Sequence, residues 1–263
     1  MELFHAVIYG VVEGVTEFLP ISSTGHLMLT THILGEGNSA FIKSFEIMIQ
    51  LGAILAVVFL YPKRLLTDRA TIMRVGSAFI PTAILGLLFY KIIKTYLMGS
   101  VAIVLIALFV GGVVIIGIEQ YWKRRVAKQR NALTLRLIDL TLLQSAMLGA
   151  MQCIAFIPGV SRSATTIFGG MFFGLSRKEA VEFSFFLAVP TMAAATVLDV
   201  AKNYHSFTLD NLSFLSVGFA TSFIVALLSV RWLTAYVAKN DFTIFGIYRI
   251  IIAILGYLLF FYS

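Results

Sequence analysis

Long uninterrupted runs of apolar residues dominate the chain, and most charged residues fall between them. A helix that crosses a lipid bilayer needs about 20 predominantly apolar residues. Six runs approach or exceed this length, and we expect each to form one membrane-spanning helix. They cover residues 43–61, 70–94, 99–119, 178–201, 211–231 and 243–262. The pattern therefore predicts an all-α polytopic membrane protein with about six transmembrane helices.

Two further apolar regions are interrupted by short polar turns. Residues 1–35 are broken at 20–25 (PISSTG), and residues 138–175 are broken at 158–163 (PGVSRS). Each interruption leaves two apolar halves of roughly 11 to 20 residues, which are short for crossing a bilayer. Irregular backbone at membrane depth persists only where protein buries it or where it lines a cavity. We therefore expect two re-entrant helix–loop–helix elements.

The basic residues in the loops test this topology. If both interrupted regions return to the side from which they came, 14 of the 20 Lys and Arg residues share one side, 4 lie on the other and 2 lie inside the membrane. If both regions crossed fully, nine or ten basic residues would lie outside. Cytoplasmic loops carry the excess of Lys and Arg, so we expect both termini outside. The larger set is Lys63, Arg64, Arg69, Arg74, Lys123, Arg124, Arg125, Lys128, Arg130, Arg136, Arg177, Lys178, Arg231 and Lys239; the smaller is Lys43, Lys91, Lys94 and Lys202.

A shared pattern links the two interrupted regions at an offset of 139 residues. The matched pairs are Gly10 with Gly149, Glu13 with Gln152, and Ser22 with Ser161. Each half then runs as one broken element followed by three spans. Because three is odd, the second half must be inverted relative to the first, an arrangement that builds polar sites at the membrane midplane. We expect one membrane domain over 1–263, with inverted repeats at about 1–136 and 137–263.

The composition agrees with this pattern and excludes several other classes of protein. Apolar residues make up 59% of the chain and charged residues 13%, about half the usual charged share of a soluble domain. This excludes a soluble globular enzyme, a disordered chain and a secreted disulfide scaffold, and the long apolar blocks argue against a transmembrane β-barrel. The net charge of +7 reflects Lys and Arg in loops, so we expect no nucleic-acid partner.

Ionisable residues inside the apolar regions are candidates for function, because burying a charge in lipid is costly. Glu13 and Glu17 are four residues apart, so they share one helix face. Two carboxylates there repel each other unless a cation, a proton or an arginine joins them. Ser23 and His26 are three residues apart, a spacing that can place a hydroxyl beside an imidazole, as a nucleophile and its base require.

The second interruption carries a candidate phosphate site. Arg162 offers a planar fork that matches phosphate oxygens, and the hydroxyls beside it belong to Ser161, Ser163 and Thr166. A half-helix starts here, and the free N–H groups and positive dipole at its N-terminus favour an anion. In an inverted repeat, the equivalent half-helix near Ser22 would approach from the opposite side. These groups together describe an oxyanion site, and phosphate fits it best.

A second intramembrane arginine, Arg249, lies within the last span. We expect it to snorkel or to form a structural ion pair with a carboxylate. The chain contains no HExxH, P-loop, GxSxG or GxGxxG motif. Their absence argues against zincins, P-loop NTPases and α/β-hydrolases.

Two stretches of the sequence resemble a known family. Residues 13–26 (EGVTEFLPISSTGH) and 158–166 (PGVSRSATT) are similar to segments of the undecaprenyl-diphosphate phosphatases, also called bacitracin-resistance proteins. The resemblance runs along nearly the whole chain, including its length, the repeat and residues 246–249 (GIYR) of the last span. Ala164 stands where the family more often has glycine, which is a small change in a helix turn.

The resemblance implies an integral membrane enzyme of the bacterial cytoplasmic (inner) membrane. Its activity would be hydrolysis of undecaprenyl diphosphate to undecaprenyl phosphate and inorganic phosphate, which recycles the lipid carrier for cell-wall synthesis and confers bacitracin resistance. A divalent cation, magnesium or calcium, is also implied. The residues expected to act are Glu13, Glu17, Ser23, His26 and Arg162 in catalysis, Ser22, Ser161, Arg162, Ser163 and Thr166 in phosphate binding, and Glu13 and Glu17 in cation binding.

Several alternatives stay open at this point. The nucleophile is Ser23 with His26 as base, His26 itself, or a water that His26 activates. The alternative function is a polyprenyl-phosphate transporter or flippase with the same midplane site. Such a carrier needs Arg162 but no nucleophile, so the set of Ser23, His26 and Glu17 favours the enzyme. Expected partners are undecaprenyl diphosphate and the lipid bilayer, with a homodimer as a further possibility.

Overall fold

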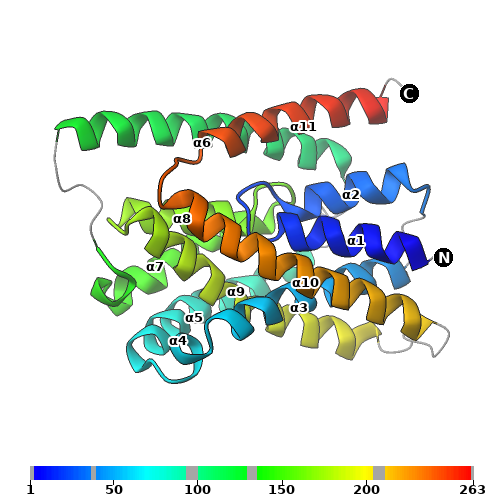
Figure 1. The fold of residues 1–263 in the computed structure, drawn as a ribbon, viewed down its shortest axis with the longest axis horizontal. Helices are drawn as coiled ribbons and strands as arrows, with labels where there is room; N and C mark the ends of the chain where they lie inside the picture. Colours follow the sequence, from blue (N-terminus) through cyan, green and yellow to red (C-terminus); the bar gives the residue numbers. More distant parts are fainter. Residues whose placement is uncertain (1–2, 37–39, 93–99, 129–134, 204–210, 262–263) are drawn as a thin grey trace.

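The computed structural model describes residues 3–36, 40–92, 100–128, 135–203 and 211–261. Helices account for most of this part of the chain, and its β-structure is one isolated bridge between Leu135 and Leu175. Helices α6 and α11 lie side by side along one edge of the bundle (Figure 1). The elements are α1 (Leu3–Thr16), α2 (Ser23–Ile33), α3 (Ala40–Leu60), α4 (Pro62–Leu66), α5 (Arg69–Ile92), α6 (Val101–Lys128), the 3₁₀ helix η2 (Leu137–Asp139), α7 (Leu142–Gln152), the 3₁₀ helix η3 (Cys153–Phe156), α8 (Arg162–Phe172), α9 (Arg177–Asn203), α10 (Leu212–Val237) and α11 (Thr243–Phe261).

Six of these helices are long and apolar enough to cross a membrane, which confirms the predicted number of spans. They are α3, α5, α6, α9, α10 and α11. The largest differences are at the ends of α6 and α10, which continue to residues 128 and 237, beyond the predicted 119 and 231. In α6 the added residues include Lys123, Arg124, Arg125 and Lys128, which form helix well, whereas α10 continues over a further short apolar stretch, residues 232–237. The predicted span ends at 94 and 99 lie outside the described residues.

The two interrupted regions form matching pairs of short helices. Helices α1 and α7 begin at residues 3 and 142, α2 and α8 begin at 23 and 162, and α2 and α8 end at 33 and 172. Each pair of positions differs by 139, the offset that the sequence gives. Three long helices follow each pair, so the order of elements is consistent with the predicted repeat.

The short helices pack reciprocally between the two halves. Helix α1 lies against α10, the second long helix of the second half, and α7 lies against α5, the second long helix of the first (Figure 1). A Cβ on Gly10 would come within 2.7 Å of the Gly218 carbonyl oxygen, and one on Gly149 would overlap the Ala78 carbonyl oxygen. The matched glycines therefore mark two equivalent close helix crossings.

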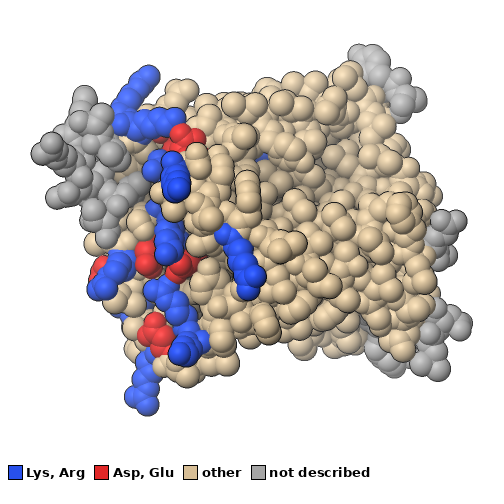
Figure 2. Space-filling model, in the orientation of Figure 1, with Lys and Arg blue, Asp and Glu red and all other residues tan. Residues whose placement is uncertain are grey.

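Charged side chains gather at one end of the molecule. Figure 2 shows Lys, Arg, Asp and Glu in a band at the end where α4 and the last turns of α6 lie, whereas both termini lie at the opposite end (Figure 1). Arg130 and Lys94 of the sequence-based count lie outside the described residues. Between the two ends, large apolar side chains such as Leu87 and Leu88 are more than two-thirds exposed, as a surface facing lipid requires.

Candidate active site

The first interruption is a turn of residues 17–22 between α1 and α2. Glu17 still donates its backbone N–H to the Glu13 carbonyl oxygen (N···O 2.9 Å), so the turn begins as a continuation of α1. Pro20 has no N–H with which to extend the helix. Ser22 then adopts a φ of 70° and caps α2, its hydroxyl accepting from the N–H of Gly25 (3.5 Å).

The second interruption repeats this local structure. After η3, Gly159 has a φ of 93° and Ser161 a φ of 82°. The Ser161 hydroxyl caps α8 by accepting from the N–H of Ala164 (3.2 Å). Ser22 and Ser161 are the positive-φ residues other than glycine in the described chain, and both stand directly before a half-helix. A positive φ is sterically unfavourable for an L-residue, so both turns hold strained backbone at equivalent points.

The two interruptions meet, although they are far apart in the sequence. The Ser163 hydroxyl donates to the Leu19 carbonyl oxygen (2.7 Å). Arg162 forms an ion pair with Glu17, with 2.9 Å between Nη2 and Oε1. The structure therefore brings the two sequence motifs into one buried cluster.

Glu17 is the centre of this cluster. Its Oε1 accepts from Arg162, and its Oε2 accepts from the Ser23 hydroxyl (2.6 Å). The Glu17 side chain is 5% exposed and that of Arg162 is 15% exposed, so water screens the pair weakly. One carboxylate thus joins a guanidinium of the second half to a hydroxyl of the first.

The sequence spacing predicts that His26 lies beside the Ser23 hydroxyl. In the structure, His26 and Ser23 form hydrogen bonds with other partners. Its Nδ1 lies 2.8 Å from the Ser22 carbonyl oxygen and its Nε2 lies 2.8 Å from the Tyr248 hydroxyl of α11. A carbonyl oxygen only accepts hydrogen bonds, so Nδ1 carries a proton. In this structure the carboxylate of Glu17, and not the imidazole, is the group placed to take a proton from Ser23.

Glu13 is fully buried, and within the described residues neither of its carboxylate oxygens has a hydrogen-bond partner. Glu17 lies four residues further along the chain. Arg162 pairs with Glu17, so Glu13 is the carboxylate that still requires a proton or a cation, and its unpartnered oxygens suit a hard divalent cation. The described chain gathers no set of three His, Cys, Asp or Glu residues around a common point.

The hydroxyls expected to bind phosphate are occupied by protein partners. Ser161 and Ser163 share a hydrogen bond (2.9 Å), and Thr166 donates to the Ser184 hydroxyl of α9 (2.7 Å). Arg162 also donates through Nη1 to the Ser184 carbonyl oxygen (2.7 Å). Arg162 Nε is buried and has no partner among the described residues, which leaves it as a donor for a ligand.

The prediction that Arg249 forms an ion pair with a carboxylate is wrong. The described structure surrounds its guanidinium with backbone carbonyl oxygens instead. Sequence reasoning also missed Tyr248 and Ser184, which hold His26 and Arg162. Tyr248 stands beside an intramembrane arginine, a usable signal, whereas nothing in its surroundings distinguishes Ser184 from other serines in spans.

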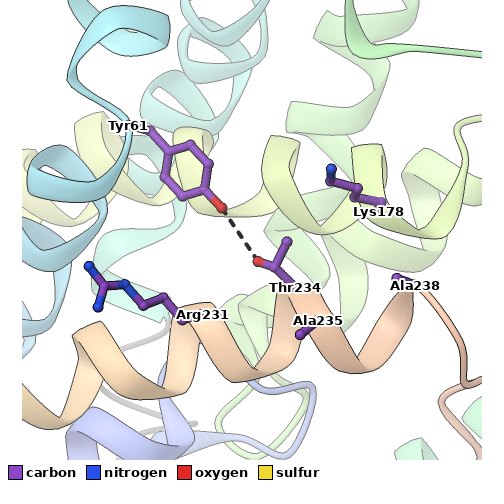
Figure 3. Close-up of a pocket in the computed structure, with 6 residues that line it drawn as sticks. All are labelled: Tyr61, Lys178, Arg231, Thr234, Ala235 and Ala238. Atoms are coloured by element: carbon purple, nitrogen blue, oxygen red, sulfur yellow. Dashed lines mark hydrogen bonds between the residues drawn. The ribbon is translucent and has the colours of Figure 1, made fainter.

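A surface pocket of about 370 Å³ lies elsewhere, between α9, α10 and the end of α3 (Figure 3). Its Tyr61 and Thr234 hydroxyls lie 3.4 Å apart. The lining residues are Tyr61, Lys178, Arg231, Thr234, Ala235 and Ala238. None of them is a predicted site residue, so this pocket is separate from the cluster around Glu17.

The fold and the cluster together define a multi-pass helical membrane protein with a buried polar site between two broken helices. The chain belongs to the family described as bacitracin resistance protein BacA, whose sequence profile matches residues 6–255. It is 48% identical over 256 residues to the undecaprenyl-diphosphatase of Aquifex aeolicus (strain VF5), covering 97% of each chain. It is 47% identical to the undecaprenyl-diphosphatase of Sulfurihydrogenibium sp. (strain YO3AOP1), covering 98% of this chain and 99% of the relative. The same enzyme of Persephonella marina (strain DSM 14350 / EX-H1) is also 47% identical, over 96% of each chain.

Proposed function

We propose that this protein is an undecaprenyl-diphosphate phosphatase that releases undecaprenyl phosphate and inorganic phosphate. The observation that carries the proposal is the contact of Glu17 with both Ser23 and Arg162. It joins a hydroxyl nucleophile, a base and a phosphate-binding cation from the two motifs. The names of the relatives supply the substrate, and near-complete coverage of their chains supports carrying it over.

The diphosphate would bind between the N-termini of α2 and α8. Helix N-termini present free N–H groups and a positive dipole end, both of which favour phosphate. Arg162 Nε adds a buried donor without a partner among the described residues. As negative charge moves onto the leaving oxygen, these fixed donors stabilise the transition state. The isoprenoid chain would remain in lipid.

In the first chemical step, the Ser23 oxygen attacks the terminal phosphorus. The bond between that phosphorus and the bridging oxygen breaks, undecaprenyl phosphate leaves, and the Ser23 proton passes to Glu17. Water then attacks the phosphoserine, the bond between phosphorus and the Ser23 oxygen breaks, Glu17 returns its proton to that oxygen, and inorganic phosphate leaves while the proton of the attacking water passes to solvent. The 2.6 Å bond between Ser23 and Glu17 favours this route over attack by His26, whose two ring nitrogens are engaged by Ser22 and Tyr248.

Glu13 would hold the divalent cation together with diphosphate oxygens. The buried, unpartnered carboxylate oxygens support this assignment. Each oxygen of Glu17 accepts one hydrogen bond, and the remaining lone pairs of this carboxylate could join the cation. When bound, magnesium or calcium would offset charge on the diphosphate.

The orientation in the membrane follows from the charge distribution. We place the end rich in Lys and Arg in the cytoplasm, because that side of a bacterial inner-membrane protein carries the basic excess. Both termini would then face outward. We further propose that the two halves are inverted repeats, which the reciprocal packing of α1 on α10 and of α7 on α5 supports. A homodimer and the absence of nucleic-acid binding stay predictions.

The decisive experiment is phosphate release from undecaprenyl diphosphate by purified protein, with and without EDTA. We expect release that EDTA abolishes and magnesium or calcium restores. Ser23→Ala and Arg162→Ala should each lower turnover by about 10²–10⁴-fold. The matched control is Ser229→Ala in α10, whose hydroxyl donates to the Val225 carbonyl oxygen of the same helix (3.0 Å), and it should behave as wild type.

Two outcomes would overturn the proposal in different ways. Movement of the lipid across vesicles without phosphate release would favour the transporter. Phosphate release with an acid-labile phosphohistidine in place of an acid-stable phosphoserine would assign attack to His26 and reject Ser23.

A further inference from the structure

Arg249 is the largest fully buried side chain among the described residues, and it uses its whole guanidinium on backbone oxygens. Nε donates to Leu108 (3.3 Å) and Nη2 to Ala107 (2.9 Å), both on α6. The other contacts are Nη2 to Gly159 (2.8 Å), Nη1 to Val160 (2.9 Å) and Nη1 to Pro20 (3.2 Å). These five bonds match the five N–H donors of an arginine.

Three of the five carbonyl groups belong to the two interruptions, Pro20 to the first and Gly159 and Val160 to the second. Pro20 lies two residues before Ser22, the cap of α2, and Val160 lies directly before Ser161, the cap of α8. One side chain on α11 therefore fixes the backbone that enters both half-helices. Because a guanidinium is planar and rigid, it also fixes the separation of the two turns.

The surrounding backbone leaves space for this side chain. A Cβ on Gly111 would overlap Arg249 Nη2, and one on Gly112 would lie 3.2 Å from Arg249 Cβ. No carboxylate pairs with Arg249 in the described structure. A buried charge without a counter-charge is costly for stability alone, and carbonyl dipoles offset only part of that cost. A positive charge at this position would stabilise an anion that binds nearby.

We propose that Arg249 is a positioning residue for the diphosphate site. It holds the Ser22–Ser23 turn and the Ser161–Arg162 turn at the separation that one diphosphate bridges, and its charge favours the anion. Tyr248, the preceding residue, contacts His26, so α11 supports the site at two consecutive positions. This inference rests on the proposed function for its substrate, but the separation of the two turns is a property of the protein alone.

The test compares Arg249→Lys with Arg177→Lys. Lysine keeps the charge but loses the fork, so it cannot hold all five carbonyl groups. The control, Arg177, forms an ion pair with the buried Glu119 at the basic end, with 2.7 Å between Nη2 and Oε2, and its own side chain is 25% exposed. Both variants lose an arginine fork that binds protein partners, and only the first touches the two turns.

We expect Arg249→Lys to lower kcat by about 100-fold per folded molecule, because small misplacements of reacting groups have effects of that size. Its KM for undecaprenyl diphosphate should rise as well. Arg177→Lys should lower the Tm and leave kcat and KM unchanged. Wild-type kcat and KM in Arg249→Lys would overturn the positioning role.

A second readout does not depend on activity. Ile33 and Phe172 end α2 and α8 at equivalent positions, and both are about 70% exposed. Spin labels on Ile33→Cys and Phe172→Cys, in a Cys153→Ser background, report the distance between the half-helices by pulsed electron paramagnetic resonance. We expect a broader or displaced distribution in Arg249→Lys and an unchanged one in Arg177→Lys. An unchanged distribution in Arg249→Lys would also overturn the proposal, even if activity fell.

If Arg249→Lys does not fold, Gly111→Ala takes its place. Its new methyl group displaces the guanidinium without removing it, and the same changes are expected. If wild-type protein releases no phosphate while the spin-label distances respond as expected, the proposed substrate fails and the positioning of the two turns stands.

Discussion

At the scale of single residues, the two positive-φ serines are the clearest departure from relaxed geometry. Ser22 and Ser161 have φ values of 70° and 82°, and such backbone costs about 1–3 kcal/mol at each position. Glycine would adopt this conformation freely but would remove the hydroxyl that caps the half-helix. Serine therefore exchanges some stability for a hydroxyl at the start of each half-helix.

Ser161→Ala and Ser161→Gly separate the two effects. Alanine loses the cap on the Ala164 N–H and the bond to Ser163 but keeps the strained φ, so we expect a loss of about 1 kcal/mol. Glycine loses the same bonds but relieves the strain, so its Tm should lie above that of the alanine variant. Thermal unfolding of both variants in one detergent measures this. A glycine variant less stable than the alanine variant would contradict the strain argument.

The residues predicted for the site stand out in the sequence, but their hydrogen-bond partners do not. Glu13, Glu17 and Arg162 stand out because ionisable residues are rare inside apolar segments. The three-residue spacing of Ser23 and His26 fits a shared helix face, yet the hydroxyl bonds to Glu17. That choice depends on the path of the turn at 17–22, whose positive φ at Ser22 no local pattern indicated.

At the scale of helices, close crossings decide how the two halves fit. Helices α7 and α5 approach so closely that Gly149 has no room for a side chain beside the Ala78 carbonyl oxygen. The Thr82 hydroxyl strengthens this crossing by donating to the Gly149 carbonyl oxygen (2.8 Å). In membranes, small residues and interhelical hydrogen bonds provide much of the association between helices.

Gly149→Ala should force these helices apart. The new Cβ would meet backbone, which cannot move aside as a flexible side chain can, so we expect a loss of about 1–3 kcal/mol. Gly76→Ala on α5 is the matched control. Nothing lies within 4 Å of its added Cβ, so stability should rise by about 0.4–1 kcal/mol. Thermal unfolding of both variants checks the prediction, and an equal response at the two glycines would refute the close-crossing explanation.

At the scale of the whole molecule, the two ends differ in charge, because the Lys and Arg side chains gather at one of them. The band of Lys and Arg lies at the end opposite both termini (Figure 2). The basic excess on cytoplasmic loops sets the orientation of a polytopic protein. The position of the termini is therefore a direct test of the proposed topology.

Two single cysteines introduced into a Cys153→Ser background test this orientation. Leu3 lies at the start of α1, and Lys239 follows α10 at the basic end; both are exposed. A membrane-impermeant maleimide added to spheroplasts should label Leu3→Cys and should label Lys239→Cys only after permeabilisation. The Cys153→Ser parent controls for background labelling. The reverse pattern would invert the proposed orientation.

The sequence by itself determined the six spans, the two interruptions and the residues that gather in the site. These are local properties, because the length of an apolar run and the residues that break it are readable without knowing any partner. Tertiary structure alone decided that Ser23 bonds to Glu17 and that Arg249 binds carbonyl groups from both turns. Arg249 and Pro20 are 229 residues apart, and only the packing of α11 against α6 and the two turns brings them together.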